Sequence, residues 1–141
     1  MSINAYLAVG LGSAIGSVLR YSVSLASMAV LGSHFPWGTL LVNVLGSCLI
    51  GWLAGTASRA PHGKLARWQP LLVAGFCGGF TTFSLFSLET LHLAQQGSMG
   101  LALLYGIGSL PLCVFSAWMG ERLAHQRPNL LIRGSLEQQQ P

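Results

Sequence analysis

The chain has 141 residues, of which 52% are hydrophobic and only 7% are charged, and its formal net charge is +4. A soluble domain carries about 25% charged residues because its surface must be hydrated, so this composition excludes a water-facing globule. The positive charge does not indicate nucleic-acid binding, because no stripe of basic residues is present to follow a phosphate backbone.

Four apolar stretches are each long enough to cross a bilayer, which takes about 20 residues of helix. They predict an all-α, multi-pass membrane protein. The stretches cover residues 5–30, 37–57, 70–92 and 100–120; they lie in one transmembrane domain over residues 1–125, followed by a polar tail over residues 126–141 that we expect to be disordered.

The first span contains an ionisable residue, Arg20. A charge is costly in lipid, so Arg20 should reach water or a partner, and Glu89 in the third span is one candidate for an ion pair. Gly12 and Gly16 form a GxxxG pair, which lets two helix backbones approach closely. No Lys or Arg precedes Arg20, and the apolar stretch is long for a signal peptide, so we expect a helix rather than a cleaved leader.

The second span follows Pro36, a residue suited to a helix start, and opens with Trp37 as an interfacial anchor. Asn43 lies in the middle of this span. A buried amide needs partners, so Asn43 either makes an interhelical hydrogen bond or lines a water-filled path. Gly51 and Gly55 form a second GxxxG pair.

The third span has the most unusual sequence, and Gly78-Gly79 followed by Thr81-Thr82 is a poor centre for a helix. We therefore predict a helix that is broken in the middle of the membrane. Such a break frees backbone carbonyls that can bind a cation such as Na⁺. Alternatively, the glycines serve packing and the hydroxyls bond back to the helix backbone.

Two aromatic and two hydroxyl residues follow at helical spacing. Phe83 and Phe86 share one face, and Ser84 and Ser87 form a second pair beside it. Aromatic rings have a positive edge, so these rings could contact an anion. Aromatic pairs in helices are more often simple packing residues, and both interpretations stay open at this point.

In the fourth span Tyr105, Ser109 and Cys113 recur every four residues and therefore lie along one stripe. Such a stripe either lines a pore or forms a packing seam. The other two cysteines, Cys48 and Cys77, lie far from Cys113 in sequence, and no CxxC or Cys/His cluster is present, so we expect no zinc site.

Three segments carry motifs that follow one another in order along the chain. They are GSAIGSVLRY at residues 12–21, PWGTLLVN at residues 36–43 and GFCGGFTTFSLFSLE at residues 75–89. Together they resemble the Fluc/CrcB family of fluoride channels; the fourth span is compatible with the family, and the tail after Glu121 is not covered. The resemblance implies passive fluoride efflux and fluoride resistance, in a bacterial inner membrane.

The resemblance also implies an assembly. Family members form an antiparallel, dual-topology dimer with two fluoride pathways and one central, structural Na⁺. The partner of this chain would be a second copy, giving a homodimer, or a relative of opposite orientation, giving a heterodimer.

Individual residues receive roles from the same resemblance. The backbone carbonyls of Gly78 and Thr81 would bind Na⁺. Asn43 would donate to fluoride and hold Phe83, and the ring edges of Phe83 and Phe86 would contact the ion. The remaining pathway residues would be Ser84, Thr82, Tyr105, Ser109 and Arg20, the last at a vestibule that collects anions. Cys113, which stands where a hydroxyl is usual, and Pro111 depart from the family pattern.

Fluoride is small and strongly hydrated, so a pore must replace its water with hydrogen-bond donors. Hydroxyls, an amide and ring edges can do this without a fixed positive charge. Conduction also needs binding weak enough for release, and no Lys lies in any of the four spans.

Other function classes fit less well. A small multidrug-type, proton-coupled antiporter needs an acid in its first span, and this span has none. A non-transporting scaffold would explain the glycines but not the aligned Phe and Ser pairs. We expect no enzyme, because the sequence contains no catalytic constellation and no nucleotide-binding loop.

The basic residues predict an orientation. Four spans place both termini and the central loop on one side, and six basic residues lie there: Arg59, Lys64, Arg67, Arg122, Arg127 and Arg133. The opposite side has none. The positive-inside rule therefore places both termini in the cytoplasm, in tension with the weak bias that a dual-topology homodimer normally shows.

Overall fold

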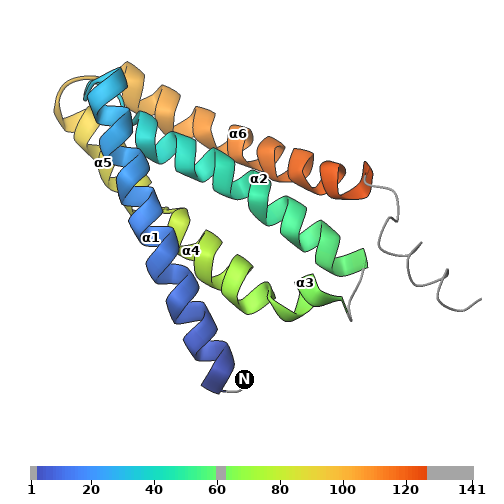
Figure 1. Cartoon of the computed structure of the whole chain (residues 1–141). Helices are drawn as coiled ribbons and strands as arrows, with labels where there is room; N and C mark the ends of the chain where they lie inside the picture. Colours follow the sequence, from blue (N-terminus) through green and yellow to red (C-terminus); the bar gives the residue numbers. More distant parts are fainter. Residues whose placement is uncertain (1–2, 60–62, 127–141) are drawn as a thin grey trace, which may run out of the picture.

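A computed structural model describes residues 3–59 and 63–126, and within these residues the chain is helical and has no strand. Four helical stretches are long and apolar enough to cross a membrane (Figure 1). They are α1 (Ile3–Leu31), α2 (Trp37–Arg59), the third span (Pro70–Gln95) and α6 (Met99–Gln126), and the short helix α3 (Lys64–Arg67) precedes the third span. This confirms the predicted all-α membrane class with four transmembrane helices.

The third span is not one regular helix. It begins as a π-helix, η1 (Pro70–Cys77), continues as a single α-helical turn, α4 (Gly78–Phe80), and resumes as α5 (Ser84–Gln95). The π-helical part was not expected from the sequence. Its wider turns precede the point where the helix is interrupted, and π-helical segments are often found near functional sites.

Tight turns join the spans at one end of the bundle. Gly32 and Gly97 both have φ of 80°, a conformation that other residues rarely adopt. The Gly32 amide donates to the Met28 carbonyl at 3.1 Å, which closes the end of α1. At the other end of the bundle α6 runs to Gln126, the first residue of the tail expected over 126–141; the rest of that tail lies outside the described residues.

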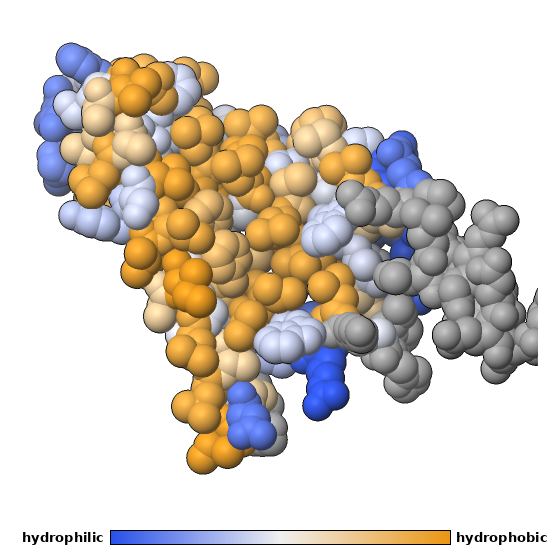
Figure 2. Space-filling model, viewed as in Figure 1, coloured by the Kyte–Doolittle hydropathy of each residue, from blue (hydrophilic) through white to orange (hydrophobic). Residues whose placement is uncertain are grey.

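The sides of the bundle are apolar and largely uncovered. Only 11–28% of the residues in the four spans are buried within this chain. Figure 2 shows hydrophobic residues along the visible flank of the molecule, with the hydrophilic residues gathered toward its ends. A protein of this kind is stable only with lipid or another apolar surface around it, as expected for a multi-pass membrane protein.

Helix α1 packs on η1 and α4 through glycines on both sides of the contact (Figure 1). A Cβ at Gly12 would overlap the Leu71 carbonyl oxygen, and a Cβ at Gly16 would overlap the Phe76 carbonyl oxygen. In return, a Cβ at Gly75 would lie 2.8 Å from the Val9 carbonyl oxygen. The predicted GxxxG contact of α1 is therefore confirmed, and its partner is the third span.

Helices α2 and α6 lie side by side as a second tightly packed pair (Figure 1). A Cβ at Gly51 would overlap the Ala117 carbonyl oxygen, and one at Gly120 would overlap the Cys48 carbonyl oxygen. The Ser116 hydroxyl donates across the pair to the Val44 carbonyl at 2.8 Å. Close backbone approach replaces the hydrophobic effect as the source of helix association in lipid.

The α2–α6 pair is also tied at its far end. The Arg59 guanidinium donates to the Ala124 and His125 carbonyls at 2.9 and 3.1 Å. These carbonyls belong to the last turn of α6, and the last four carbonyls of a helix have no partner within that helix. Arg59 therefore caps α6 and fixes the end of α2 against it.

Candidate functional site

The third span is interrupted directly after its glycines. Gly78 and Gly79 are helical, and the chain becomes extended at Thr81, with φ of −87° and ψ of 159°. Helical hydrogen bonding resumes in α5 from Ser84 onward. The sequence indicated the correct region, but the residues out of helical conformation are the threonines and not the glycines, of which Gly79 packs against the Ser13 backbone and Gly78 is open.

Asn43 of α2 pairs with the backbone of the interruption. Its Nδ2 donates to the Thr82 carbonyl at 2.9 Å, and the Thr82 amide donates to its Oδ1 at 2.8 Å. The side-chain amide thus replaces the helical partners that Thr82 lacks. One of the two Nδ2 hydrogens makes this bond, which leaves the other available to a ligand.

Hydroxyl groups satisfy further backbone atoms at the same point. The Thr81 hydroxyl donates to the Cys77 carbonyl at 2.9 Å, as does the Thr81 amide. The Leu85 amide donates to the Thr82 hydroxyl at 3.2 Å, which caps the start of α5. The Thr82 and Ser84 hydroxyls lie 3.3 Å apart, so these two predicted pathway residues are in contact.

Two backbone carbonyls at the interruption have no donor within the described chain, those of Gly78 and Thr81. In an unbroken helix they would accept from Thr82 and Leu85, but those amides donate to side chains instead. The described residues also contain no group of three His, Cys, Asp or Glu side chains that could hold a metal. The uncommitted carbonyls suit a hard cation such as Na⁺, which prefers oxygen ligands.

The two phenylalanines that follow differ in their surroundings. Phe86 is 9% exposed and packs against Tyr105 of α6, with ring centroids 5.0 Å apart. Phe83 is 73% exposed, and its ring centroid lies 5.6 Å from that of Phe86. Phe86 therefore belongs to the core of this chain, whereas Phe83 needs lipid or a second chain to cover it.

Tyr105 and Ser109, on one face of α6, are both buried, and the Ser109 hydroxyl donates to the Tyr105 carbonyl at 2.6 Å. Cys113 continues the stripe and lies beside the Ser47 side chain of α2. The helix passes through Pro111 without a break, and Pro111 is exposed on the outer surface. The stripe expected in the fourth span is thus present, and it faces inward.

A carboxylate joins three helices beside this stripe. Glu89 of α5 accepts from the Thr39 hydroxyl of α2 at 2.8 Å and from the Tyr105 hydroxyl of α6 at 2.9 Å. Sequence reasoning placed neither Thr39 nor Glu89 in the site. The available signal was that Glu89 is the one acidic residue in the four spans expected from the sequence, since an intramembrane charge marks function by default.

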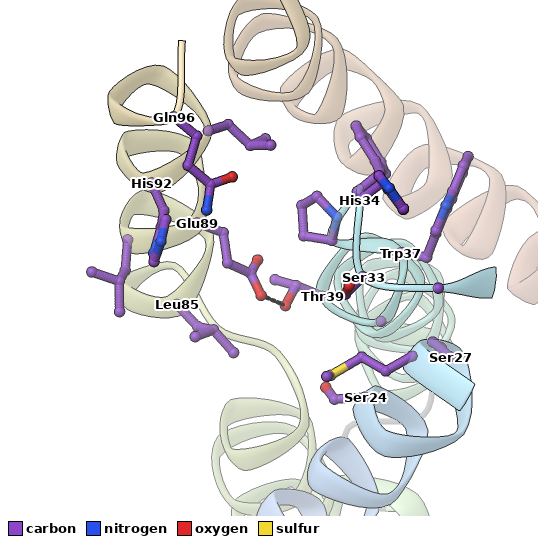
Figure 3. A pocket seen from close by; sticks show the side chains of 17 residues that line it. Ser24, Ser27, Ser33, His34, Trp37, Thr39, Leu85, Glu89, His92 and Gln96 are labelled. Carbon is purple, nitrogen blue, oxygen red and sulfur yellow. Dashed lines mark hydrogen bonds between the residues drawn. The ribbon is translucent and has the colours of Figure 1, made fainter. Parts of the chain in front are cut away.

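Glu89 also lines a cavity of about 370 Å³ at the end of the bundle where the short turns lie. Figure 3 shows the Glu89 carboxylate and the Thr39 hydroxyl bonded at its centre, with His92 of α5 and Gln96, just past the end of α5, above them and His34 across the opening. Polar groups from α1, α2, α5 and the adjoining turns therefore surround this space, with Ser24 and Ser27 on the α1 side.

Arg20 is half-buried on α1, one helical turn before Ser24, which lines the same cavity as Glu89. Helix α1 contacts η1, α4 and α2, whereas Glu89 is bonded to α2 and α6. The ion pair considered between Arg20 and Glu89 is not formed; within the described ranges the one ion-pair contact joins His125 and Glu121 at 3.8 Å.

The fold and this site define a multi-pass α-helical membrane protein with an interrupted helix held against polar side chains, an arrangement typical of proteins that pass or bind ions. A family model described as CrcB-like protein, Camphor Resistance (CrcB), matches residues 7–121. The chain belongs to this family, as its three motifs indicated.

Curated relatives agree with this assignment. One from Thermus thermophilus is 50% identical over 119 residues, covering 84% of this chain and 93% of the relative. One from Magnetococcus marinus is 51% identical, covering 79% and 90%, and one from Paramagnetospirillum magneticum is 45% identical, covering 82% and 91%. All three carry the name fluoride-specific ion channel FluC.

Proposed function

We propose that this chain is a fluoride-selective channel that lets fluoride leave a bacterial cell passively across the inner membrane. The observation that carries the proposal is identity at about half of the positions, over nine-tenths of their length, to relatives named for that activity. Those relatives are ion channels, so the chain is a channel and not an enzyme. The antiporter alternative is not favoured, because the relatives carry a channel's name.

The geometry supports a pathway of uncharged donors. The second hydrogen of the Asn43 amide, the edges of Phe83 and Phe86 and the hydroxyls of Thr82 and Ser84 all gather at the interruption. Each can replace part of the hydration shell of a small anion without holding it as a fixed cation would. The Tyr105 and Ser109 hydroxyls extend this series along α6.

The hydroxyls farther along this pathway are engaged within the chain. Tyr105 and Thr39 both donate to Glu89, and Ser109 donates to its own helix. A hydroxyl has a single hydrogen, so Tyr105 presents an oxygen, and not a donor, toward any anion beside it while this bond lasts. For Tyr105 to donate to an anion, its hydroxyl must first turn away from Glu89.

The surface supports assembly with a second chain in antiparallel orientation. Phe83 is exposed, and a Cβ at Gly78 would meet no atom within 4 Å, so this face of the interruption is uncovered. With two copies facing each other, the Gly78 and Thr81 carbonyls of both would supply four oxygens to one structural Na⁺. The residues fit that ion because both carbonyls lack a donor in the described chain.

Six basic residues lie on one side of the membrane in the predicted topology and none on the other, and this bias bears on the identity of the partner chain. A strong bias favours one orientation, and an antiparallel homodimer needs both. We favour self-pairing, and a relative of opposite orientation is the alternative. Cysteine-accessibility labelling of the C-terminus in intact cells distinguishes them: labelling from both sides supports the homodimer, and labelling from one side alone supports the heterodimer.

Flux from liposomes reconstituted with this chain tests the function. We expect rapid fluoride efflux and little chloride efflux, because chloride is larger and a close-fitting donor series excludes it. Equal leakage of the two ions would overturn the proposed selectivity. Fluoride efflux that appears only after a relative is added would show that the chain conducts only as a heterodimer.

A further inference from the structure

Two serines on α1 donate to the backbone of the third span. The Ser13 hydroxyl donates to the Gly75 carbonyl at 3.3 Å, and the Ser17 hydroxyl donates to the Gly79 carbonyl at 3.4 Å. The donors are four residues apart on one helix, and so are the acceptors on the other. They form two equivalent contacts, one helical turn apart, along the glycine-packed surface between α1 and the third span.

The Gly79 carbonyl is available to Ser17 because the helix is interrupted. In a continuous helix this carbonyl would accept from the Phe83 amide, four residues on. Helix α4 ends at Phe80, and that bond is not made. Ser17 therefore supplies the donor that the interruption removes, whereas the Gly75 carbonyl already accepts from the Gly78 amide and gains Ser13 as a second donor.

Close packing makes these bonds rigid. A Cβ at Gly79 would overlap the Ser13 backbone, and a Cβ at Gly16 would lie 2.8 Å from the Phe80 amide nitrogen. The peptide unit after Gly79 is thus held by α1 on one side. Gly78, one residue earlier, is open on the other side, and its carbonyl has no donor in the described chain.

We propose that Ser17, assisted by Ser13, positions the Gly78 and Thr81 carbonyls for cation binding. The inference rests on the Na⁺ site put forward under Proposed function. A segment that is already fixed loses little freedom when it binds an ion, whereas a segment freed from Ser17 must be ordered at that moment. Ser17 is a positioning residue, since its hydroxyl bonds to Gly79 and not to either proposed ligand.

The test is the Na⁺ dependence of thermal unfolding for the purified full chain in detergent, with N-methylglucamine replacing Na⁺ at constant ionic strength. An ion that binds only the folded state stabilises that state by RT ln(1 + [Na⁺]/Kd), so the midpoint rises with the logarithm of the Na⁺ concentration once this exceeds Kd. The variants are Ser17→Ala and a matched control, Ser22→Ala. The Ser22 hydroxyl lies on the same helix but donates only to the Val18 carbonyl, within that helix.

We expect Ser17→Ala to raise the Kd for Na⁺, obtained from the rise of the midpoint with Na⁺ concentration, about fivefold, which is the effect of one lost hydrogen bond. Ser22→Ala should leave it unchanged. This Kd does not depend on the stability without Na⁺, so a purely structural role for Ser17 would lower the midpoint at every Na⁺ concentration and leave the Kd unchanged. If Ser17→Ala does not fold, Ser17→Cys, with a weaker donor of similar size, should give a smaller shift in the same direction.

The outcomes separate the inference from its premise. A wild-type midpoint that responds to Na⁺, with an identical response in Ser17→Ala, would refute the role of Ser17 and leave the cation site standing. Equal shifts in both variants would also refute it, because the effect would then be general to α1. A wild-type midpoint with no specific response to Na⁺ would remove the cation site and this inference together, whatever the fluoride flux.

Discussion

Replacing Asn43 should release the interruption of the third span. In Asn43→Ala the Thr82 amide and carbonyl lose the partners they now have at 2.8 and 2.9 Å. Thr82 is only 9% exposed, so water replaces these partners poorly. The variant therefore tests directly whether one side chain of α2 maintains the extended conformation at Thr81 and Thr82.

The size of the effect follows from the two bonds. Interhelical side-chain hydrogen bonds in membrane proteins are worth about 0.6 kcal/mol on average and about 1.7 at most. Two of them give about 1–3 kcal/mol, which corresponds to an opening equilibrium of the segment shifted about 5- to 150-fold. Fluoride flux should fall as well, since the proposed donor is lost with its support.

Hydrogen–deuterium exchange in detergent measures the opening. Peptides that cover residues 81–85 should exchange about 5- to 150-fold faster in Asn43→Ala. Thr56→Val is the matched control, because the Thr56 hydroxyl lies on the same helix and donates to Trp52 within it at 2.7 Å. Unchanged exchange at 81–85 in Asn43→Ala would refute the assigned role.

Asn43→Asp separates the two roles proposed for Asn43, which are to support the Thr82 backbone and to donate a hydrogen bond to fluoride. A carboxylate still accepts from the Thr82 amide, but it faces the Thr82 carbonyl with an oxygen in place of a donor. It also repels an anion where an amide donates. We expect fluoride flux to be suppressed at least as strongly as in Asn43→Ala, and an Asp variant that conducts normally would remove Asn43 from the pathway.

Three further substitutions have distinct expected outcomes. Gly16→Ala should destabilise the bundle by about 1–3 kcal/mol through steric overlap. Gly10→Ala is the control and should be neutral or stabilising, because its Cβ would meet open space. Similar unfolding midpoints for the two variants would contradict the proposed packing of Gly16. Phe86→Ile should lower both the stability of the protein and the fluoride flux, because Phe86 packs on Tyr105. Phe83→Ile should lower the fluoride flux alone, because Phe83 is exposed. Fluoride flux at the wild-type rate in either folded variant would exclude that ring from the pathway. Tyr105→Phe should alter the rate of fluoride passage with little loss of fold, since it removes the hydroxyl bonded to Glu89 and keeps the ring; an unchanged rate would place Tyr105 outside the pathway.

Much of the fold was predictable because lipid imposes simple rules on sequence. The four spans follow from apolar length, and the turn at Gly32 to Pro36 follows from residues that end and start helices. The disturbed centre of the third span was also visible, because Gly78-Gly79 and Thr81-Thr82 combine four weak helix formers. Each of these features is encoded locally, within about one span of sequence.

The features that could not be predicted are those that depend on a partner distant in the chain. The π-helical start of the third span leaves no periodic signature, since one extra residue per turn over η1 is a small change in spacing. The bond from Asn43 to Thr82 joins residues 39 positions apart. The sequence left open whether Asn43 would face a helix or a pore, and only the packed arrangement shows that it bonds to the interruption.

The Glu89 contact is the clearest example. Arg20 was considered because opposite charges attract, but neutral hydroxyls from Thr39 and Tyr105 reach the carboxylate instead. Which group reaches Glu89 depends on which helices lie beside α5. No pattern in the sequence specified that α5 packs on α6 and not on α1.

The pairing of Asn43 with Thr82 has a consequence for how the protein is made. Asn43 precedes Thr82 in the chain, so during synthesis the second span enters the membrane before the third. The Thr82 backbone can therefore gain its Asn43 partner only when the third span meets a helix that is already in the bilayer. Every step that delays the meeting of these two helices also delays the formation of the two bonds that join them.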